Sequence, residues 1–543
     1  MTSLGPIFAD DLARVKPGDR LRLTISAQTS DAAALAQAAL EARARGERVL
    51  VVCADPADVP RLAQEMPWFE PKLDVRPLPD WETLPYDVLS PQEELVSERL
   101  EALYRLTAPT GGADVLLTSA VTASQRLSPV SYIGANTFFF HQGEQISLTT
   151  LQKRLAAAGY ANVKQVLAAG EFAVRGSIVD VFPMGSERPF RLDFFDDEIE
   201  SIRWFDVDTQ RSMESAEEIR LLPGHEFPVD PEALLAFRQR WRREFAGDPK
   251  KSIVYCDIEK EILPPGIEYY LPLFFDETAA LTDYLPPNAR VFLLGDIEVA
   301  LQAFGRDMAS RYKVLAADPQ RPALAPERIW LKPEEFFKSL ANFARFTVEK
   351  KENAEDLKRL TGIEVDRKSQ NPVGKLLERT RESAMKGVRT LIAAPSAGRM
   401  ETMSQLLRTG GLSVEEFPDW QTFLDADSSL GIAAAPLFSG AVFHHPEIVI
   451  LSEAELYAAS PRRHRLRRVK HATTLEMMVR DVAELKPGDA VVHADHGIGR
   501  YQGLVHMETP DGDAEFLEIT YKNDAKLFVP ITNLQLISRY AGA

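Results

Sequence analysis

The stretch ERVLVVCADP, residues 47–56, decides the fold of the first part of the chain. Its apolar run VLVVC is typical of a strand that is buried on both faces of a parallel sheet. The Ala-rich stretch 31–45 before it predicts a helix, and Gly46 stands where a glycine would end that helix. LRLTIS (21–26) and ADVLLTSA (113–120) predict further strands. Alternating strands and helices predict a doubly wound α/β sheet.

The loop after the first predicted strand reads Ser26-Ala27-Gln28-Thr29-Ser30. In a nucleotide-binding fold of this layout, that loop would bind phosphate. It has no glycine to let backbone amides approach a phosphate and no lysine to neutralise the charge. The pattern G-x-x-x-x-G-K-[ST] occurs nowhere in the chain. We therefore expect a degenerate P-loop-like site, no catalytic residue, and no cofactor or metal bound by this chain.

Length, charge and cysteine content limit the number of domains, the kinds of partner and the cellular compartment that we expect. The 543 residues suffice for about three to five domains. The net charge of −17 does not favour a broad surface for duplex DNA. The only cysteines, Cys53 and Cys256, predict buried thiols in a reducing cytoplasm. No apolar run approaches the roughly 18 residues of a membrane helix, so we expect a cytoplasmic protein with no membrane partner.

The region 138–222 changes to the alternation that is typical of antiparallel strands. FRLDFF (190–195) places Phe190, Leu192 and Phe194 on one face and leaves Arg191 and Phe195 on the other. A large exposed aromatic side chain beside an arginine is typical of a protein interface. The alternative is that Phe195 packs under a neighbouring loop.

FAVRGSIVDVF (172–182) predicts a second strand of this region. As one continuous strand it would place Arg175 on the same face as Ser177 and Val179. If this strand pairs with 190–195, Arg175 joins Arg191 and Phe195 on one surface.

The whole pattern predicts a multidomain α/β protein with a β-rich insert and a C-terminal β-barrel. Its expected segments are the first half of the α/β domain at 1–137, the insert at 138–222, the second half of the α/β domain at 223–350, a linker at 351–374, a small α/β domain of unknown role at 375–460, a basic linker at 461–480 and the barrel at 481–543.

Two features near the C-terminus are candidate contacts. Leu504, Val505 and Met507 form an apolar stretch after a glycine turn. An exposed strand edge with apolar residues can pair with a partner strand, and the alternative is ordinary core alternation. The basic run RRHRLRRVKH (462–471) favours a solvated linker, although weak contact with DNA phosphates is an alternative.

These residues together resemble the N-terminal part of the bacterial transcription-repair coupling factor family. The resemblance spans nearly the whole chain in the family's order. It rests on DWETLPYDVLSPQEELVSERLEALYRL (80–106), RGSIVDVFPMGSERPFRLDFFDDEIESIRWFDVDTQRS (175–212), LLPGHEFP (221–228), GIEYYLPLFF (266–275), VVHADHGIGRYQG (491–503) and YKNDAKLFVPITNLQLISRYAG (521–542).

The resemblance implies a role for most segments. The first three expected segments, up to residue 350, would form a module related to the excision-repair protein UvrB. Residues 375–460 would form the family's small variable domain. The C-terminal segment would form a Tudor/SH3-like domain that is shared with CarD-type regulators and binds RNA polymerase. It implies a UvrA-binding site at Arg175, Arg191 and Phe195. It also implies contacts with the polymerase β subunit at Leu504, Val505 and Met507.

Full-length members of the family continue into an ATP- and Mg-dependent DNA translocase and a C-terminal domain that covers the UvrA-binding surface. This chain stops where the family's barrel ends, so we expect no motor, no enzymatic activity and an open surface. We expect a protein that links stalled RNA polymerase to UvrA. The alternatives are an ATPase with a divergent phosphate site and a direct binder of damaged DNA like UvrB. The stretch VLSPQEELVS (88–97) lacks the aromatic and basic residues of a damage-binding hairpin.

Overall fold

The structure is a computed structural model in which residues 1–458 form one compact unit and residues 459–543 form a second. It describes residues 4–8, 12–108, 112–366, 368–457, 490–493, 497–509, 512–521, 526–530 and 537–539.

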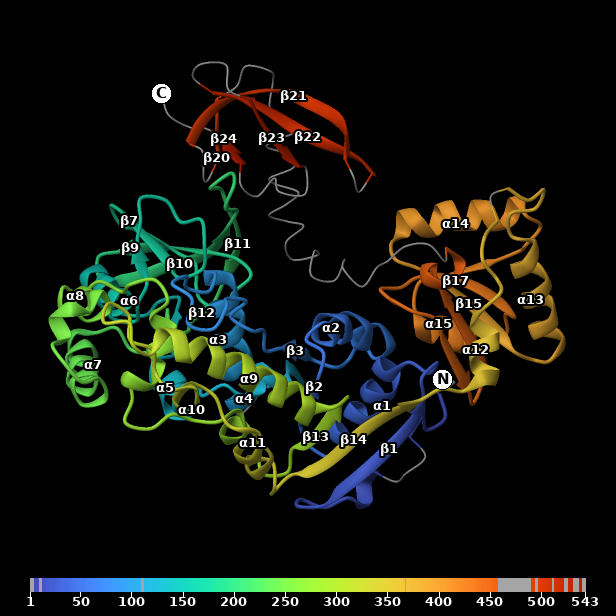
Figure 1. The fold of residues 1–543 in the computed structure, drawn as a ribbon, viewed down its shortest axis with the longest axis horizontal. Coiled ribbons are helices and arrows are strands. Elements are labelled where there is room, and N and C mark those ends of the chain that lie inside the picture. The colour runs from blue at the N-terminus through green and yellow to red at the C-terminus, as the bar shows by residue number, and fades with distance from the viewer. Residues whose placement is uncertain are drawn as a thin grey trace. The chain divides into compact units, whose positions relative to one another are not determined.

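A six-stranded, fully parallel sheet organises the first unit (Figure 1). Side chains of its strand β2 alternate between two hydrophobic clusters, since Leu50 and Val52 join one and Val51 and Cys53 the other. The prediction of a strand buried on both faces is therefore confirmed. In spatial order the strands are β1 (Arg20–Ser26), β14 (Ala344–Lys351), β13 (Arg290–Leu294), β2 (Val49–Cys53), β4 (Val115–Ser119) and β3 (Val75–Pro77).

Helices cover both faces of this sheet. The predicted Ala-rich helix is confirmed: the Ser30 side chain accepts a hydrogen bond from the Ala33 N–H at its start, and Gly46 follows its end with φ +69°. One face carries α1 (Asp31–Ala44) and α2 (Asp58–Phe69), and the other carries α3 (Glu93–Thr107), α4 (Ala120–Ser124) and α9 (Ile297–Leu315).

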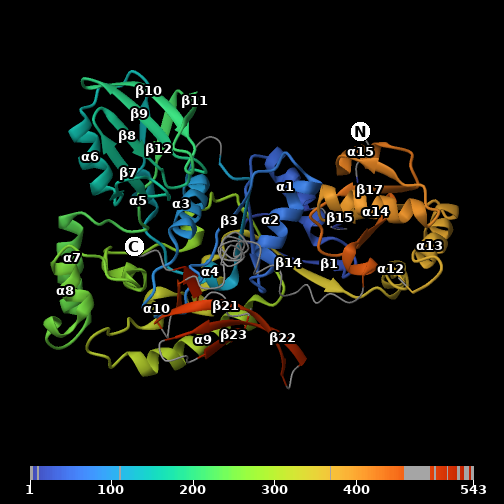
Figure 2. The same ribbon diagram turned by 90° about the horizontal axis from the view of Figure 1, so that it is seen from above.

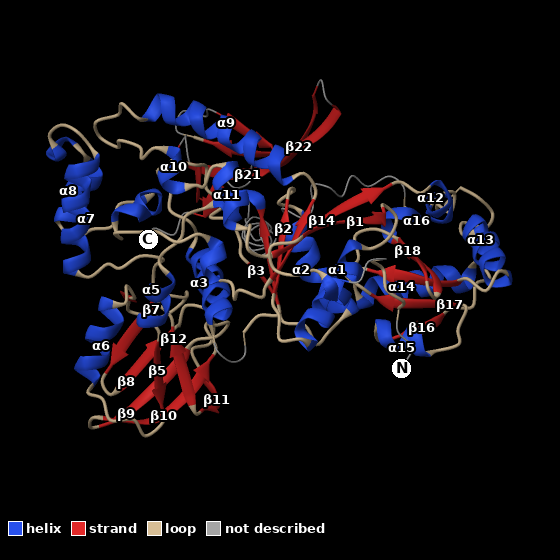
Figure 3. Ribbon diagram, turned by 90° about the horizontal axis from the view of Figure 1, so that it is seen from below, coloured by secondary structure: helices blue, strands red, loops and turns tan. Residues whose placement is uncertain are grey.

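The insert is a second sheet that is antiparallel except at one edge (Figure 3). A two-stranded sheet of β5 (Phe138–His141) and β12 (Glu218–Leu221) begins and ends it, beside α5 (Val130–Ala135) and α6 (Leu148–Ala157). The six strands, in spatial order, are β11 (Ser212–Ala216), β10 (Glu198–Phe205), β9 (Phe190–Phe195), β8 (Ile178–Val181), β7 (Glu171–Arg175) and β6 (Ala161–Asn162).

A helical region rich in aromatic residues separates the insert from the last strands of the first sheet. Its core includes Trp81, Trp241, Tyr269 and Phe274, which are all buried. It contains α7 (Pro231–Glu244), α8 (Ile253–Glu259), α10 (Pro326–Ile329) and the 3₁₀-helices η2 (Pro249–Lys251) and η3 (Ile267–Leu273). The 3₁₀-helix η4 (Leu281–Tyr284) and α11 (Pro333–Ser339) pack into a cluster of the first sheet, and the 3₁₀-helix η1 (Leu12–Arg14) lies near the N-terminus.

A smaller α/β module completes the first unit, with α13 and α14 lying against its sheet (Figure 2). The residues expected as a linker, 351–374, contribute α12 and the fully buried Ile363 and Val373, because apolar positions are dispersed among their charged residues. The module contains β16 (Glu415–Phe417), β17 (Leu430–Ala434), β15 (Arg389–Ala394), β19 (Glu447–Ser452), β18 (Ala441–His444), α12 (Ala354–Leu360), α13 (Gly374–Met385), α14 (Ala397–Thr409), α15 (Trp420–Asp425) and α16 (Glu453–Leu456).

The second unit contains a five-stranded antiparallel sheet. Val491, Leu517, Ile519 and Val529 form its buried centre. In spatial order its strands are β23 (Lys526–Pro530), β22 (Gly512–Thr520), β21 (Gly497–Thr509), β20 (Ala490–His493) and β24 (Ile537–Arg539).

The two cysteines are free thiols that differ in burial. Cys53 in β2 is buried, and burial raises the pKa of its thiol. Cys256 in α8 is partly exposed, so the expectation of burial is wrong for this residue. None of the helices in the described part of the chain combines the length and apolar character needed to span a membrane.

Candidate protein-interaction surface

The predicted interaction residues lie on one face of the insert sheet. β8 pairs with both β7 and β9, so β8 lies between the strands that carry Arg175 and Arg191. Arg175 is opposite Ile178, and Ile178 is opposite Asp193 on β9. Since alternate residues of a strand share a face, Arg175, Arg191 and Phe195 all lie on the same face.

The stretch 172–182 is a hairpin and not one strand. The chain reverses at Gly176 and Ser177, where Gly176 has φ +64°. The turn shifts the alternation, so Ile178 shares the face of Arg175 while Val179 is fully buried. The prediction that Val179 accompanies Arg175 is therefore wrong, because a turn within the apolar run changes which residues face solvent.

Phe195 is the most exposed aromatic side chain of this face. It ends β9, directly before a turn in which Asp196 has φ +52°, and 69% of its surface is exposed. It does not pack under a neighbouring loop. Phe190, Leu192 and Phe194 on the opposite face are buried as predicted, so β9 is fixed from behind by the core.

Arg191 is held by partners within the insert. Its Nε and Nη2 donate to the two carboxylate oxygens of Asp180 at 2.6 and 2.9 Å, and Nη1 donates to the Gln210 carbonyl and the Ser212 hydroxyl at 3.2 Å each. The guanidinium also lies over the Phe205 ring, 5.0 Å from its centre. Only 16% of the side chain is exposed, and the hydrogen bond to the Asp180 carboxylate raises the pKa of Arg191.

Arg175 differs from Arg191 because it is exposed at the end of β7. Its Nη2 donates one hydrogen bond, 2.8 Å long, to the Lys164 carbonyl. Its remaining donors face solvent and can pair with a carboxylate of a partner. The face therefore presents one exposed aromatic side chain, Phe195, and one exposed guanidinium, that of Arg175. Arg191 instead joins β9 to β8 through Asp180.

The predicted degenerate phosphate site lies at the end of β1, and residues of the small α/β module occupy it. The Ser26 hydroxyl donates to Asp356 at 2.8 Å, and the Val442 N–H donates to the Gln28 carbonyl at 2.9 Å. The Thr29 hydroxyl donates to the Val442 carbonyl at 3.1 Å. The polar groups of this loop thus bond to the chain itself.

A buried ionic cluster continues this contact. Asp31 at the start of α1 accepts two hydrogen bonds from Arg61, at 2.8 and 2.9 Å, and pairs with Lys350 at 2.5 Å. Burial alone would raise the pKa of Asp31, but the two cations outweigh it and lower the pKa to about 2. Arg61 also pairs with Glu65, which accepts from the Phe438 N–H of the small module at 3.0 Å. Among the described residues, no three potential metal ligands are grouped.

The C-terminal candidates lie on β21. Its residues 501–509 pair with β22, whereas β20 pairs only with 497–500, so within the described residues one edge of 501–509 has no strand beside it. Val505 is partly exposed, and the side chains of Leu504 and Met507 lie outside the described residues. The basic run 462–471 also lies outside them.

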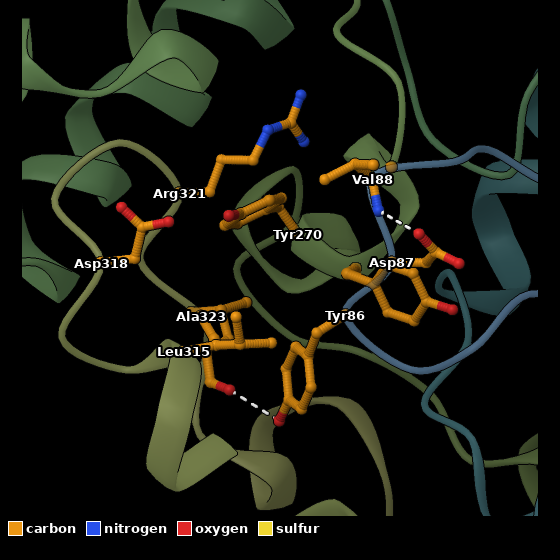
Figure 4. Close-up of a pocket in the computed structure, with 11 residues that line it drawn as sticks. Tyr86, Asp87, Val88, Tyr270, Leu315, Asp318, Arg321 and Ala323 are labelled. Atoms are coloured by element: carbon orange, nitrogen blue, oxygen red, sulfur yellow. Dashed lines mark hydrogen bonds between the residues drawn. The ribbon is translucent and has the colours of Figure 1, made fainter. Parts of the chain in front are cut away.

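Sequence reasoning missed one further surface, the loop between β3 and α3. Leu84, Val88 and Leu89 are each more than half exposed there. A pocket of about 70 Å³ opens beside Val88, with Tyr86 and Tyr270 on its walls (Figure 4). The available signal was an apolar run without helical or strand periodicity in an acidic stretch that contains no lysine or arginine.

Comparisons with known proteins agree with this organisation. A sequence profile for the UvrB interaction domain matches residues 138–227. A profile for the MFD D3 domain matches residues 384–456, and one for the CarD-like/TRCF RID domain matches residues 485–541. The exposed face of the insert and the strand edge of β21 thus lie in segments that match named interaction domains.

The chain is also similar to curated proteins over most of its length. It is 38% identical over 504 residues to the transcription-repair-coupling factor of Escherichia coli K12, which covers 91% of this chain and 43% of that protein. It is 38% identical over 480 residues to that of Haemophilus influenzae (86% and 41%), and 24% identical over 493 residues to that of Bacillus subtilis (83% and 39%). The chain therefore spans about two fifths of the length of these relatives.

Proposed function

Because the chain belongs to the transcription-repair-coupling factor family, we propose that it is a recruitment module that links RNA polymerase to the excision-repair protein UvrA. In this proposal the chain performs no catalysis and holds two protein partners at once. The insert binds UvrA, and the C-terminal sheet binds the polymerase β subunit. The activities of the longer relatives enter this proposal only as the context in which such a link is useful.

The observation that carries the proposal is the exposed Phe195 on a rigid sheet that matches the UvrB interaction domain. An exposed aromatic side chain costs little entropy on binding and offers a large apolar area, which is typical of the residues that dominate interface energies. Arg175 supplies a guanidinium for a carboxylate of UvrA. Arg191 fixes β9 through Asp180 and thereby positions Phe195.

The polymerase contact is proposed at the edge of β21. A strand whose N–H and C=O groups lack a neighbour can pair with an edge strand of a partner, and this mode gives affinity through the backbone. Leu504, Val505 and Met507 would add apolar contacts beside that pairing. The match of residues 485–541 to the CarD-like/TRCF RID domain supports this assignment.

The proposal contains no nucleotide step. The loop after β1 lacks the glycines and lysine of a phosphate site, and Asp356 and Val442 bond to its polar groups. A ligand phosphate would have to replace these contacts without gaining a cation in return. We therefore propose that this chain neither binds nor hydrolyses ATP.

The test uses the purified full chain with UvrA and RNA polymerase core enzyme. Size-exclusion chromatography should show a complex with each partner and a ternary complex with both. A chain that binds either partner but never both contradicts the linking role. ATP hydrolysis by the chain alone would favour an ATPase, and tight, salt-dependent binding of damaged duplex DNA would favour a direct damage binder.

A further inference from the structure

The loop between β3 and α3, residues 79–92, is held in one shape by distant parts of the chain. We name it the Tyr86 loop. The Tyr86 hydroxyl donates to a main-chain carbonyl 238 residues further along the chain, and the Tyr269 hydroxyl donates to the Leu84 carbonyl at 2.8 Å. Glu82 and Tyr86 have φ values of +56° and +63°, a region that residues with a Cβ rarely adopt. The surrounding fold therefore imposes the shape of the loop.

The far end of the loop is anchored by a buried carboxyl group. The Ser90 hydroxyl donates to Glu268 at 2.8 Å and accepts a hydrogen bond from the Gly266 N–H at 2.9 Å. Gly266 has φ +78°, and a Cβ there would lie 2.5 Å from the Asp87 carbonyl oxygen. The loop and η3 thus approach each other as closely as a glycine permits.

This rigid loop turns apolar side chains toward solvent. Leu84, Val88 and Leu89 are 58%, 52% and 61% exposed. They lie within six consecutive residues around a turn that the Asp87 N–H closes by donating to the Leu84 carbonyl at 2.8 Å. An imposed conformation that exposes several large apolar side chains is typical of a binding surface, because burial would otherwise be favoured.

A pocket beside the apolar residues can receive one side chain. Its walls include the rings of Tyr86, Tyr269 and Tyr270 together with Val88, and its volume is about 70 Å³ (Figure 4). The Tyr86 and Tyr270 hydroxyls already donate to backbone carbonyls. The rings therefore present apolar faces, and the charged residues Asp318 and Arg321 also line the pocket (Figure 4).

The charge around these residues selects a class of partner. Glu82, Asp87, Glu93 and Glu94 form no ion pair with any described residue, and residues 80–98 contain no lysine or arginine. Burial together with neighbouring carboxylates raises the pKa of Glu93. A cationic partner would relieve this repulsion, whereas an acidic partner would increase it.

We propose that the Tyr86 loop is a docking site for a protein segment that carries one large apolar side chain flanked by lysine or arginine residues. The apolar side chain enters the pocket beside Val88. The flanking cations pair with the carboxylates of the loop, and Leu84 and Leu89 cover the apolar part of the segment. This contact is separate from the UvrA surface proposed on the insert.

The experiment selects displayed random 12-residue peptides on the immobilised full chain. Peptides with one large apolar residue and at least two nearby cations should be enriched. A synthetic peptide with that consensus should bind at least tenfold more weakly to the triple variant Leu84→Asn, Val88→Asn, Leu89→Asn. The exposed Met385→Gln on α13 is the matched control and should bind as the wild type does.

Hydrogen exchange of the free triple variant shows whether its fold is retained, and we expect wild-type protection in η3 and α9. If that protection is lost, the single variant Leu89→Asn replaces the triple one. Failure to enrich a consensus, enrichment of acidic peptides, or equal binding to the substituted protein would each overturn the proposal.

Discussion

The loop after β1 lies where a nucleotide-binding fold would bind phosphate and the end of β9 lies where a partner protein would bind, but the two differ in what contacts them. Other residues of the chain hydrogen-bond to the loop after β1, whereas the end of β9 is exposed. At β1, the small α/β module bonds to the loop through Asp356 and Val442. At β9, Phe195 remains 69% exposed above a fully packed core. The difference indicates that the polar groups of the loop after β1 serve an internal contact, while the exposed ring at the end of β9 is available to a partner.

The two regions also differ in how their charged side chains are buried and paired. The cluster of Asp31, Arg61 and Glu65 is almost fully withdrawn from water, so each charge depends on its partners. On the insert, Arg191 and Asp180 form a similar buried pair, but the neighbouring Arg175 is exposed and has free donors. Removing one charge or one ring at a time tests this contrast.

Arg61→Ala should have the largest effect, because it leaves the buried Glu65 without a cation and the buried Asp31 with Lys350 alone. We expect the unfolding free energy of the first α/β sheet with its docked module to fall by about 3–5 kcal/mol. Hydrogen exchange in β15 and β19 during denaturant titration measures this loss. Arg22→Ala, which removes an exposed pair with Glu349, is the control and should cost less than about 1 kcal/mol.

The Tyr86 loop is anchored by the buried carboxyl group of Glu268. The unfolding free energy of the protein should therefore depend on pH. Burial raises the pKa of Glu268 to about 7, well above the 4.5 of an ordinary glutamate. The folded state thus retains the proton that the unfolded state loses first. The resulting stabilisation is complete below pH 4.5 and is lost as the pH rises through 7, about 3 kcal/mol in total.

Denaturation of wild type and Glu268→Gln between pH 4.5 and 8 measures this effect as the difference between the two proteins. The wild type should lose stability relative to the variant as the pH rises. Glu214→Gln, an exposed change on β11, should show no such trend. A constant difference between wild type and Glu268→Gln would contradict the assignment.

Arg191→Ala should lower the stability of the insert by about 2–3 kcal/mol, because Asp180 stays buried without a partner. It should also weaken UvrA binding, since β9 would be held only by its buried face and no longer by the pair with Asp180. The double variant Arg191→Ala, Asp180→Asn separates positioning from direct contact, because it removes the unpaired buried charge as well and should regain part of the lost stability. A stable variant that binds UvrA less well would instead indicate direct contact by Arg191.

Arg175→Ala should have the smallest effect. Its side chain makes one hydrogen bond, to the Lys164 carbonyl, and is otherwise exposed. We expect a loss of about 0.5–1 kcal/mol in UvrA binding and no measurable change in thermal stability. Lys153→Ala, an exposed change on α6, is the control for altered net charge, and an equal loss there would attribute the effect to charge alone.

The sequence predicts features that depend on local periodicity. The apolar run of β2 and the period-two alternation of β9 are each typical of a strand. The buried central strand and the exposed Phe195 could therefore be predicted from them. The turn at Gly176 does not interrupt the apolar pattern, so the hairpin was missed. The Asp180–Arg191 pair joins neighbouring strands whose register the sequence does not give. Nor do periodicity rules apply to the Tyr86 loop, whose shape depends on Tyr269 and Glu268 nearly two hundred residues away.

The most direct test of the account is calorimetric titration of UvrA into the full chain and into Phe195→Ala. Leu235→Ala, at an exposed leucine on α7, controls for the loss of apolar surface elsewhere. The account predicts that the wild type and Leu235→Ala bind UvrA alike, and that Phe195→Ala binds about 2 kcal/mol more weakly with unchanged thermal stability. Equal affinity of all three proteins, or no binding by the wild type, would contradict it.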